Sequence, residues 1–183
     1  MDELASQGGE SDVTIRRATA ADVDAFTAFG ARTFFEAFAG DNTPEDMRLH
    51  LEKAWRPELQ AAEISDPSFD TLLACDAQGT FAGFAQLRAG RAPPNVPASD
   101  PIELWRFYVD RPWQGCGVAQ QLMAAAIRRA HERGGRSLWL GVFERNQRAQ
   151  AFYRKSGFRP VGSQTFIVGT DPQRDVVMLR DLP

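Results

Sequence analysis

The sequence predicts an α/β (α+β) protein in which one mixed β-sheet carries helices on both of its faces. Segments with helical periodicity and segments with strand periodicity alternate along the chain. A hairpin pattern also lies beside a β-α-β unit over residues 102–143, and such units build mixed sheets. The 183 residues show no internal repeat and no clear boundary, so we expect a flexible tail over residues 1–11 and one domain over residues 12–183.

The N-terminal third is predicted to hold one short strand followed by helices. Residues 13–16 favour a strand, and a helix that opens at residues 20–22 is broken at residues 40–42. Thr43 is the predicted N-cap of the next helix, with Pro44 at its first position and Asp46 at the capping-box position. Pro57 either ends this helix or begins another short one that reaches Ile64.

The rest of the chain supplies most of the sheet. Strand patterns cover residues 69–75, 80–87, 102–109 and 137–143, and two final strands are expected around residues 161–167 and 176–179. Helices are predicted over residues 117–133 and 147–156. The prolines of residues 91–101 exclude a central strand there and predict a surface loop.

Composition narrows the possible functions. With 43% apolar and 25% charged residues the chain has a globular composition, and no apolar run approaches the roughly 20 residues of a membrane span. A net charge of −3 argues against a nucleic-acid partner. Two cysteines and two histidines leave little for disulfides or a metal site, and residues 1–12 lack a secretory signal, so we expect a reduced, cytoplasmic domain without metal. His50 and His131 have polar neighbours on helical segments and are expected to be solvated.

The most informative segment is a glycine-rich turn between the strand at residues 102–109 and the helix that follows. Backbone N–H groups at such a turn, together with the helix dipole, favour an anion such as a phosphate around Gly115 and Gly117. A tight turn without a ligand is the alternative. A P-loop has Lys followed by Ser or Thr at this point, but the chain has Val118 and Ala119, so a P-loop is excluded. A dinucleotide-binding fingerprint needs a small residue where the chain has Gln120, so that motif is excluded as well.

The remaining pattern, Gln114-x-x-Gly117-x-Ala119, resembles the pyrophosphate loop of the GNAT family of acetyl-CoA-dependent N-acyltransferases. Further motifs follow the family's order, namely Phe107-Tyr108-Val109, Trp139-Leu140-Gly141-Val142, Asn146 and a helix that carries Tyr153. The resemblance covers roughly residues 13–181. It implies a seven-stranded, mostly antiparallel sheet splayed near its centre, acetyl-CoA as co-substrate, and a possible homodimer.

Within the family, residues 42–47, 139–146 and 162–179 look like the PaiA branch, whose members acetylate polyamines such as spermidine and spermine. One departure is Trp105, because the PaiA-like pattern carries a second Glu at this position. That departure would suit a flatter or more apolar amine.

Acetyl transfer to an amine requires a base for the ammonium and an acid for the leaving thiolate. Glu103 is the predicted base, acting directly or through water, because strand alternation places it on one face with Trp105, Phe107 and Val109. Its position also matches the Glu that several family members use. The alternative is a surface residue at the start of a strand. Tyr153 corresponds to the family's general acid, and its alternative role is that of a core aromatic residue.

The resemblance also implies the cofactor contacts. Backbone groups of Phe107 and Val109 would pair with the pantetheine arm, and the Val109 N–H would polarise the acetyl carbonyl. Amides of the glycine turn would hold the pyrophosphate, and Asn146 would cap its helix and contact the arm. Cys116 is interpreted as a small loop residue rather than a nucleophile. The complete set of predicted cofactor residues is Phe107, Tyr108, Val109, Gln114, Gly115, Cys116, Gly117, Val118, Ala119, Asn146 and Tyr153.

The predicted reaction is direct transfer of an acetyl group to a primary amine of a small molecule, with a polyamine as the expected class. Four acids of the N-terminal helices could hold an ammonium group or serve only the helix dipoles: Glu36, Asp41, Glu45 and Asp46. The alternatives are a protein or peptide acceptor, or a non-catalytic acyl-CoA-binding module. Intact Glu103 and Tyr153 favour an enzyme, and neither a nucleic acid nor a membrane is expected as a partner.

Overall fold

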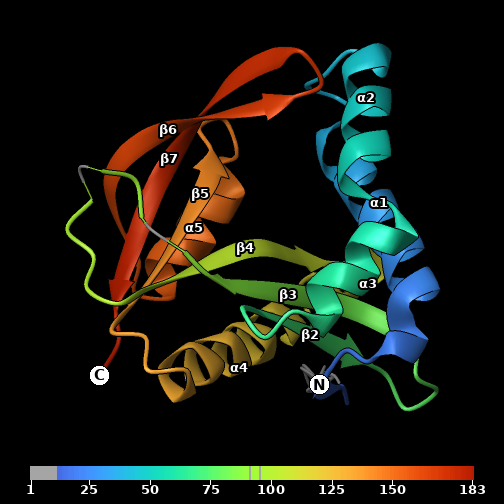
Figure 1. Ribbon diagram of the computed structural model, residues 1–183, viewed down its shortest axis with the longest axis horizontal. Helices are drawn as coiled ribbons and strands as arrows, with labels where there is room; N and C mark the ends of the chain where they lie inside the picture. Colours follow the sequence, from blue (N-terminus) through green and yellow to red (C-terminus); the bar gives the residue numbers. More distant parts are fainter. Residues whose placement is uncertain (1–11, 91, 95) are drawn as a thin grey trace, which may run out of the picture.

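The computed structural model describes residues 12–90, 92–94 and 96–183, so the tail predicted over residues 1–11 lies outside the described part (Figure 1). Helices and strands follow one another in the order β1 (Thr14–Arg17), α1 (Val23–Phe38), α2 (Pro44–Ala54), α3 (Pro57–Ser65), β2 (Phe69–Cys75), β3 (Phe81–Ala89), β4 (Pro101–Val109), α4 (Val118–Glu132), β5 (Ser137–Phe143), α5 (Gln147–Lys155), β6 (Arg159–Val168) and β7 (Asp171–Asp181). Short 3-10 turns precede α1 at Ala20–Asp22 and α4 at Arg111–Trp113.

The strands form one seven-stranded sheet in the order β1-β2-β3-β4-β5-β7-β6. Every neighbouring pair is antiparallel except β4 and β5, which are parallel. These two strands pair only where Pro101–Glu103 meets Ser137–Trp139, and beyond that point they diverge. The sheet therefore opens into two arms, β1 to β4 and β5 to β6, as Figure 1 shows. The predicted mixed, mostly antiparallel and splayed sheet is confirmed.

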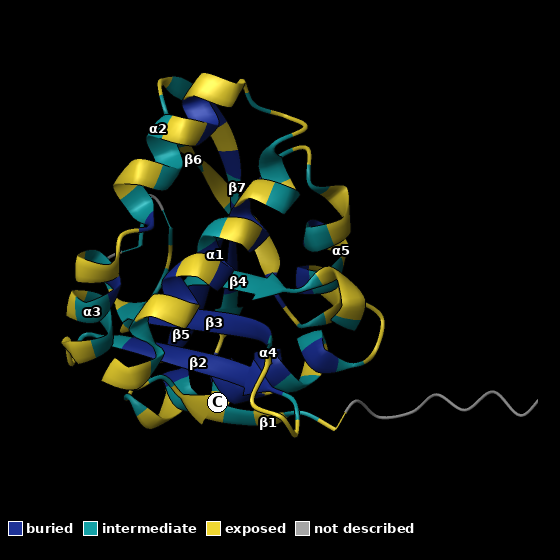
Figure 2. Ribbon diagram, turned by 90° about the vertical axis from the view of Figure 1, so that its right-hand side faces the viewer, coloured by how far each residue is buried: buried dark blue, intermediate teal, exposed yellow. Residues whose placement is uncertain are grey.

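Helices cover both faces of the first arm, as predicted, and each face has its own apolar core (Figure 2). On one face α4 packs through residues such as Leu122 and Ala126, and Tyr153 of α5 joins the same core. On the other face α1 to α3 pack through an aromatic cluster that includes Phe26 and Trp55. Burial of these side chains supplies most of the stabilisation of the fold.

A β-bulge at Trp105 reverses the two faces of β4 halfway along the strand. Leu87 of β3 lies opposite Leu104, whereas the preceding Gln86 lies opposite Arg106, so Trp105 is an extra residue on β4. Side chains an odd number of positions apart therefore share a face across the bulge. Simple alternation, which assumes a period of two, fails at this point.

The start of α2 is tied to the opposite arm of the sheet. Thr43 Oγ1 accepts a hydrogen bond from the Asp46 amide at 3.1 Å, which confirms Thr43 as the N-cap. The Asp46 carboxylate does not complete the predicted capping box. Its Oδ1 instead accepts hydrogen bonds from the backbone N–H and the hydroxyl of Thr170, at 2.7 and 2.8 Å, in the turn between β6 and β7. Pro57 begins α3 as a separate helix, which was one of the two predicted possibilities.

The last two strands are longer than predicted. Strands were expected around residues 161–167 and 176–179, but β6 spans Arg159–Val168 and β7 spans Asp171–Asp181. The missing part of β7 carries Gln173 and Asp175, which are polar and yet buried. Strands are predicted from alternating apolar residues, so this part of β7, with polar residues at its inward-facing positions, was not predicted as a strand.

Packing of α1 against Trp55 requires a glycine at position 30. A Cβ atom added to Gly30 would overlap the indole ring of Trp55, which is 7% exposed. We expect Gly30→Ala to lower the free energy of unfolding by about 1–3 kcal/mol, because overpacking outweighs the gain in helix propensity. Chemical denaturation measures this. Gly40→Ala is the control, since no atom of the described residues lies within 4 Å of an added Cβ there, and equal effects of the two substitutions would contradict this explanation.

Candidate functional site

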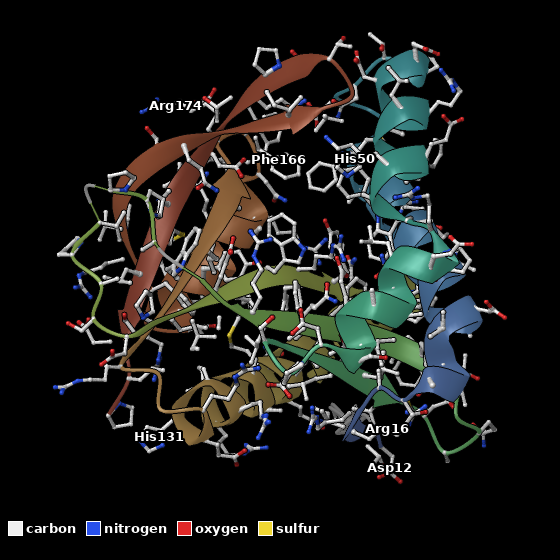
Figure 3. All side chains as sticks on the ribbon, in the orientation of Figure 1. Asp12, Arg16, His50, His131, Phe166 and Arg174 are labelled. Atoms are coloured by element: carbon white, nitrogen blue, oxygen red, sulfur yellow. The ribbon has the colours of Figure 1, made fainter. Side chains whose placement is uncertain are left out.

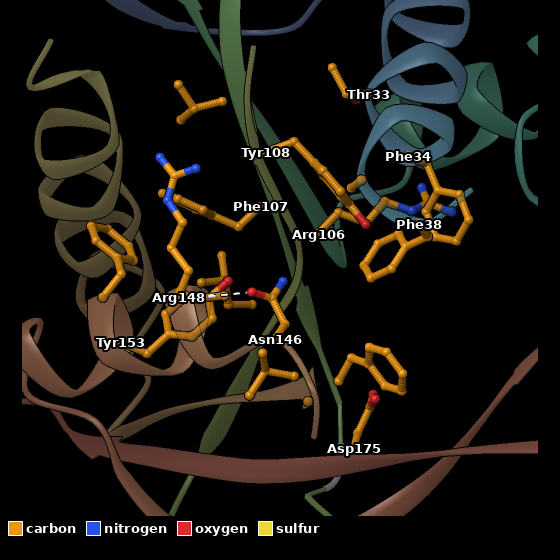
Figure 4. Close-up of a pocket in the computed structure, with 18 of the residues that line it drawn as sticks. Thr33, Phe34, Phe38, Arg106, Phe107, Tyr108, Asn146, Arg148, Tyr153 and Asp175 are labelled. Atoms are coloured by element: carbon orange, nitrogen blue, oxygen red, sulfur yellow. Dashed lines mark hydrogen bonds between the residues drawn. The ribbon is translucent and has the colours of Figure 1, made fainter. Parts of the chain in front are cut away.

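A cavity of about 470 Å³ lies where the two arms of the sheet separate. Residues from β4, β5, α1, α5 and the β6–β7 arm line it (Figure 4). One half is bordered by the end of β4, the glycine turn and α5, and we call it the cofactor half. The other is bordered by α1, β4 and the β6–β7 arm, and we call it the acceptor half.

The cofactor half contains an open strand edge. Because β4 leaves β5 after Glu103, the backbone edge from Leu104 to Val109 has no strand beside it within the described sheet. The Asp110 N–H donates to Ala82 O of the β3 side at 2.9 Å, and successive amides of a strand point to alternate edges. The N–H groups of Phe107 and Val109 therefore face the cavity. An edge of this kind fits the amides of a pantetheine arm, which can add to it like a strand.

The glycine turn presents backbone N–H groups at the start of α4. Gly115 and Gly117 have φ values of 85° and 84°, in the left-handed region, and Gly117 is the N-cap of α4. No side chain of the described residues caps this end of the helix, so the first amides and the helix dipole are available to an anion such as a pyrophosphate. The side chain of Gln114 donates to Val109 O at 3.0 Å and holds the turn against the end of β4.

Not every predicted cofactor residue can contribute a side chain. Phe107, Tyr108, Val109, Gln114, Gly115, Ala119, Asn146 and Tyr153 line the cavity. Cys116 is exposed, and the side chain of Val118 is fully buried in the core beneath α4. The Tyr108 side chain packs in the aromatic cluster of α1 to α3, so it belongs to the acceptor half. Only backbone groups of Cys116, Gly117 and Val118 are placed to meet a phosphate.

Tyr153 and Asn146 are positioned by α5. Asn146 Oδ1 accepts a hydrogen bond from the Ala149 amide at 3.0 Å, which confirms the predicted N-cap. The Tyr153 ring is 9% exposed and meets the Phe107 ring edge-on, with centroids 6.3 Å apart. Burial raises the pKa of the Tyr153 phenol above its ordinary value, so the hydroxyl stays protonated at neutral pH.

Glu103 lies on the face of β4 opposite to Phe107 and Val109, which corrects the shared face predicted from alternation. The bulge at Trp105 is the reason: Phe107 and Val109 pack towards α4, whereas Glu103 lies opposite Arg88 and accepts a hydrogen bond from its Nε at 2.5 Å. Glu103 is 4% exposed, so the alternative of a surface residue is also wrong. Burial raises the pKa of the Glu103 carboxyl, and the Arg88 guanidinium opposes that rise.

The four acids predicted near the acceptor do not gather in one place. Glu45 pairs with Arg48 on the outer face of α2, and Asp46 is bound to Thr170. Asp41 is exposed on the loop before α2. Glu36 is the member of this group that lines the cavity.

The sequence reasoning missed Asp175, an acid in the acceptor half. It lies on β7 opposite Phe143 of β5 and Gln164 of β6, and its side chain enters the cavity (Figure 4). Burial raises the pKa of Asp175 to about 6, and a hydrogen bond from Gln164 opposes that rise. The signal in the sequence was its spacing, since Asp175 alternates with the apolar inward positions Val177 and Leu179.

His50 is partly buried, whereas full exposure to solvent was predicted. Its ring stacks on Phe34 with centroids 4.2 Å apart, and it faces Phe166 across the gap between α2 and β6 (Figure 3). Burial lowers the pKa of His50 to about 4, with a contribution from the charge of Arg106, so the ring is neutral at neutral pH. His131 is exposed, as predicted. Among the residues that the structure describes, no three His, Cys, Asp or Glu side chains gather to hold a metal ion, and no helix is long and apolar enough to cross a membrane.

Asp175 is predicted to destabilise the fold at neutral pH. Its pKa rises from 3.8 to about 6 on folding, so the folded protein binds this proton more tightly than the unfolded chain and loses stability as pH increases between these values. We expect Asp175→Asn to raise the free energy of unfolding at about pH 8 by up to about 3 kcal/mol, and to have little effect at about pH 4. Denaturant titrations at both pH values test this, and a loss of stability at pH 8 would contradict it.

Comparison with known proteins points to one family. The Acetyltransferase (GNAT) family model matches residues 32–158. The chain is 32% identical over 171 residues to an uncharacterised N-acetyltransferase of Lactobacillus delbrueckii subsp. lactis. The aligned region covers 93% of this chain and 98% of that protein. It is 30% identical over 146 residues to the aminoglycoside N(6')-acetyltransferase type 1 of Stenotrophomonas maltophilia, covering 79% of this chain and 85% of that protein.

Solved structures agree with the fold. The PaiA N-acetyltransferase from Thermoplasma acidophilum, in complex with coenzyme A, has a TM-score of 0.73 at 20% identity, covering 92% of this chain and 98% of that one. At this identity the likeness supports the fold rather than a branch. The family match, the close relatives and the splayed sheet with its open β4 edge together show that the chain belongs to the Acetyltransferase (GNAT) family and is an acetyl-CoA-dependent N-acetyltransferase.

Proposed function

We propose that the enzyme transfers the acetyl group directly to a primary amine of a small cationic molecule, with polyamines as the favoured class. The observation that carries this proposal is the cavity between the arms of the sheet, which Tyr153 borders in the cofactor half and Asp175 in the acceptor half. Two reactants can occupy the two halves at the same time and meet at the split. Holding both in one cavity makes a covalent acyl-enzyme unnecessary.

Bound acetyl-CoA supplies an activated acetyl group as a thioester. The Val109 N–H, on the open edge of β4, would donate a hydrogen bond to the carbonyl oxygen as negative charge develops there. Tyr153 would donate its phenolic proton to the departing sulfur, and burial keeps that proton in place until it is needed.

Glu103 is the proposed acceptor of the amine's proton, through water. It lies in the cavity lining on the acceptor-side face of β4, where a neutral amine must form before attack. Burial raises its pKa towards a range useful for a base, while Arg88 holds the carboxylate in a fixed orientation.

Two features support a polycationic acceptor. Aromatic rings and carboxylates line the acceptor half, a combination that suits ammonium groups. The relative from Stenotrophomonas maltophilia is named for aminoglycosides, which like polyamines carry several amino groups. A protein or peptide acceptor is the remaining alternative, and the homodimer implied by the family resemblance stays a prediction.

Release of coenzyme A thiol from acetyl-CoA tests the acceptor class across spermidine, spermine, an arylalkylamine, an aminoglycoside and a basic peptide. We expect turnover with a polyamine. Tyr153→Phe should lower that turnover by about 10²-fold or more, because it removes the proton donor. Its affinity for acetyl-CoA, measured by calorimetry, should change little. Turnover confined to the peptide would replace the small-molecule proposal, and unchanged turnover in Tyr153→Phe would remove the tyrosine from the mechanism.

Glu103→Gln tests the base. We expect kcat/KM to fall by about 10²-fold near neutral pH. The deficit should shrink as the pH approaches about 10, where the free amine forms without help. Glu132→Gln, an exposed position on α4, is the matched control and should leave the profile unchanged. A deficit that stays constant across the whole pH range would argue that Glu103 supports the structure of the site instead.

A further inference from the structure

Asp175 carries a charge that no basic side chain neutralises in the described part of the structure. The residue is 8% exposed, and its carboxylate is held by a hydrogen bond from Gln164 on the neighbouring strand. The other acids of the cavity lining are paired. Glu103 lies 2.5 Å from Arg88, and Asp110 lies 2.8 Å from Arg32.

An unpaired buried carboxylate is unfavourable for folding, so its place in a cavity needs an explanation. Titratable groups whose surroundings disfavour their charge concentrate at functional sites. Arg106, which lines the same half of the cavity, is already bound to Glu63 at 2.8 Å. Arg145 lies over the Phe143 ring, 5.0 Å from its centroid, but no ion pair among the described residues includes Asp175, so its carboxylate is open to an external cation.

Aromatic rings surround this site. Phe34 and Phe38 come from α1, with centroids 4.8 Å apart, and Phe38 meets Phe143 of β5 at 6.5 Å. Tyr108 lies beyond Phe34 at 6.4 Å, and all four rings line the cavity (Figure 4). Ring faces attract cations, and they do so more strongly where water is excluded. A carboxylate beside such rings suits an ammonium group with a hydrocarbon stem.

Asp175 is separated from the place where the thiolate is expected to leave. Tyr153 packs with Met178 in the core beneath α4 and α5. Val177, the neighbour of Met178, faces the opposite side of the arm, and Asp175 shares that side because it lies two positions away. Tyr153 and Asp175 thus occupy opposite faces of this arm. A group bound at Asp175 therefore lies on the acceptor side of this arm, away from the phenol that protonates the thiolate.

We propose that Asp175 binds a second ammonium group of the acceptor, one that is not acetylated. This inference rests on the proposed function, since it assigns a role within the same cavity. The reacting amine meets the thioester at the split, while the distal ammonium lies between the Asp175 carboxylate and the rings of α1. Asp175 is then a specificity residue that selects diamines over monoamines of equal length.

Calorimetry with 1,5-diaminopentane and pentylamine tests this, on enzyme with coenzyme A bound at about pH 8. The wild type should bind the diamine at least about tenfold more tightly, because a charge-assisted contact is worth about 1.4 kcal/mol or more. Asp175→Asn should remove that preference. In initial-rate measurements the KM of the variant for the diamine should rise by at least about tenfold.

Asp181→Asn is the matched control. It makes the same substitution on the same strand at an exposed position, where Asp181 pairs with Arg159. We expect it to keep the preference for the diamine. If Asp175→Asn also kept the preference, or if the wild type showed none, the inference would be overturned. An equal fall of kcat for both amines would overturn it too, since Asp175 would then act on the reacting amine.

The two proposals fail in different ways. Should neither amine be acetylated while calorimetry still shows a diamine preference that Asp175→Asn removes, the proposed acceptor class is wrong and the Asp175 site stands. Should diamines be acetylated equally well by wild type and Asp175→Asn, the acceptor class stands and the role of Asp175 is lost.

Discussion

The separation of β4 from β5 after three paired residues determines the rest of the site. A continuous sheet would satisfy both strand edges with hydrogen bonds and leave no space between them. Here the two strands diverge after Glu103 and Trp139, so one edge of β4 stays open and a cavity forms beside it. Within the described part of the chain, the fold thus leaves backbone donors of β4 without a strand partner at the place where the co-substrate can use them.

The bulge at Trp105 places the proposed base and the residues that border the co-substrate on opposite faces of the sheet. Without the extra residue, Glu103 and Phe107 would point to the same side, and base and co-substrate would compete for one space. With it, Glu103 and Tyr108 face α1 to α3, whereas Phe107 and Val109 face α4 and α5. Bulges next to active sites commonly re-aim a side chain in this way.

Local signals predicted most of the fold and the cofactor half, because glycine turns, N-caps and long apolar strands depend on neighbouring residues. Gly117 was found from such a signal and Asn146 from the family resemblance, and the turn and the N-cap both agree with the structure. The acceptor half was predicted poorly. Asp175 enters the cavity from β7, and His50 of α2 packs against Phe34 of α1, and both placements depend on contacts between separate elements that no local pattern encodes. The inserted residue at Trp105 changes the spacing of the buried positions from two to three, but Trp105 and Tyr108 are apolar as well, which hides the change in the sequence.

The hydrogen bonds between Asp46 and Thr170 close the open sheet into a triangle. Two sides are the arms of the sheet, joined at the β4–β5 junction, and the third is formed by α1 and α2, which meet the tip of the β6–β7 hairpin (Figure 1). These two hydrogen bonds oppose a hinge motion that would move α2 away from the β6–β7 hairpin and widen the cavity. The acceptor therefore enters a space whose walls are already in place, and little conformational entropy is lost on binding. A cavity whose walls are held in this way discriminates between amines by their size and charge.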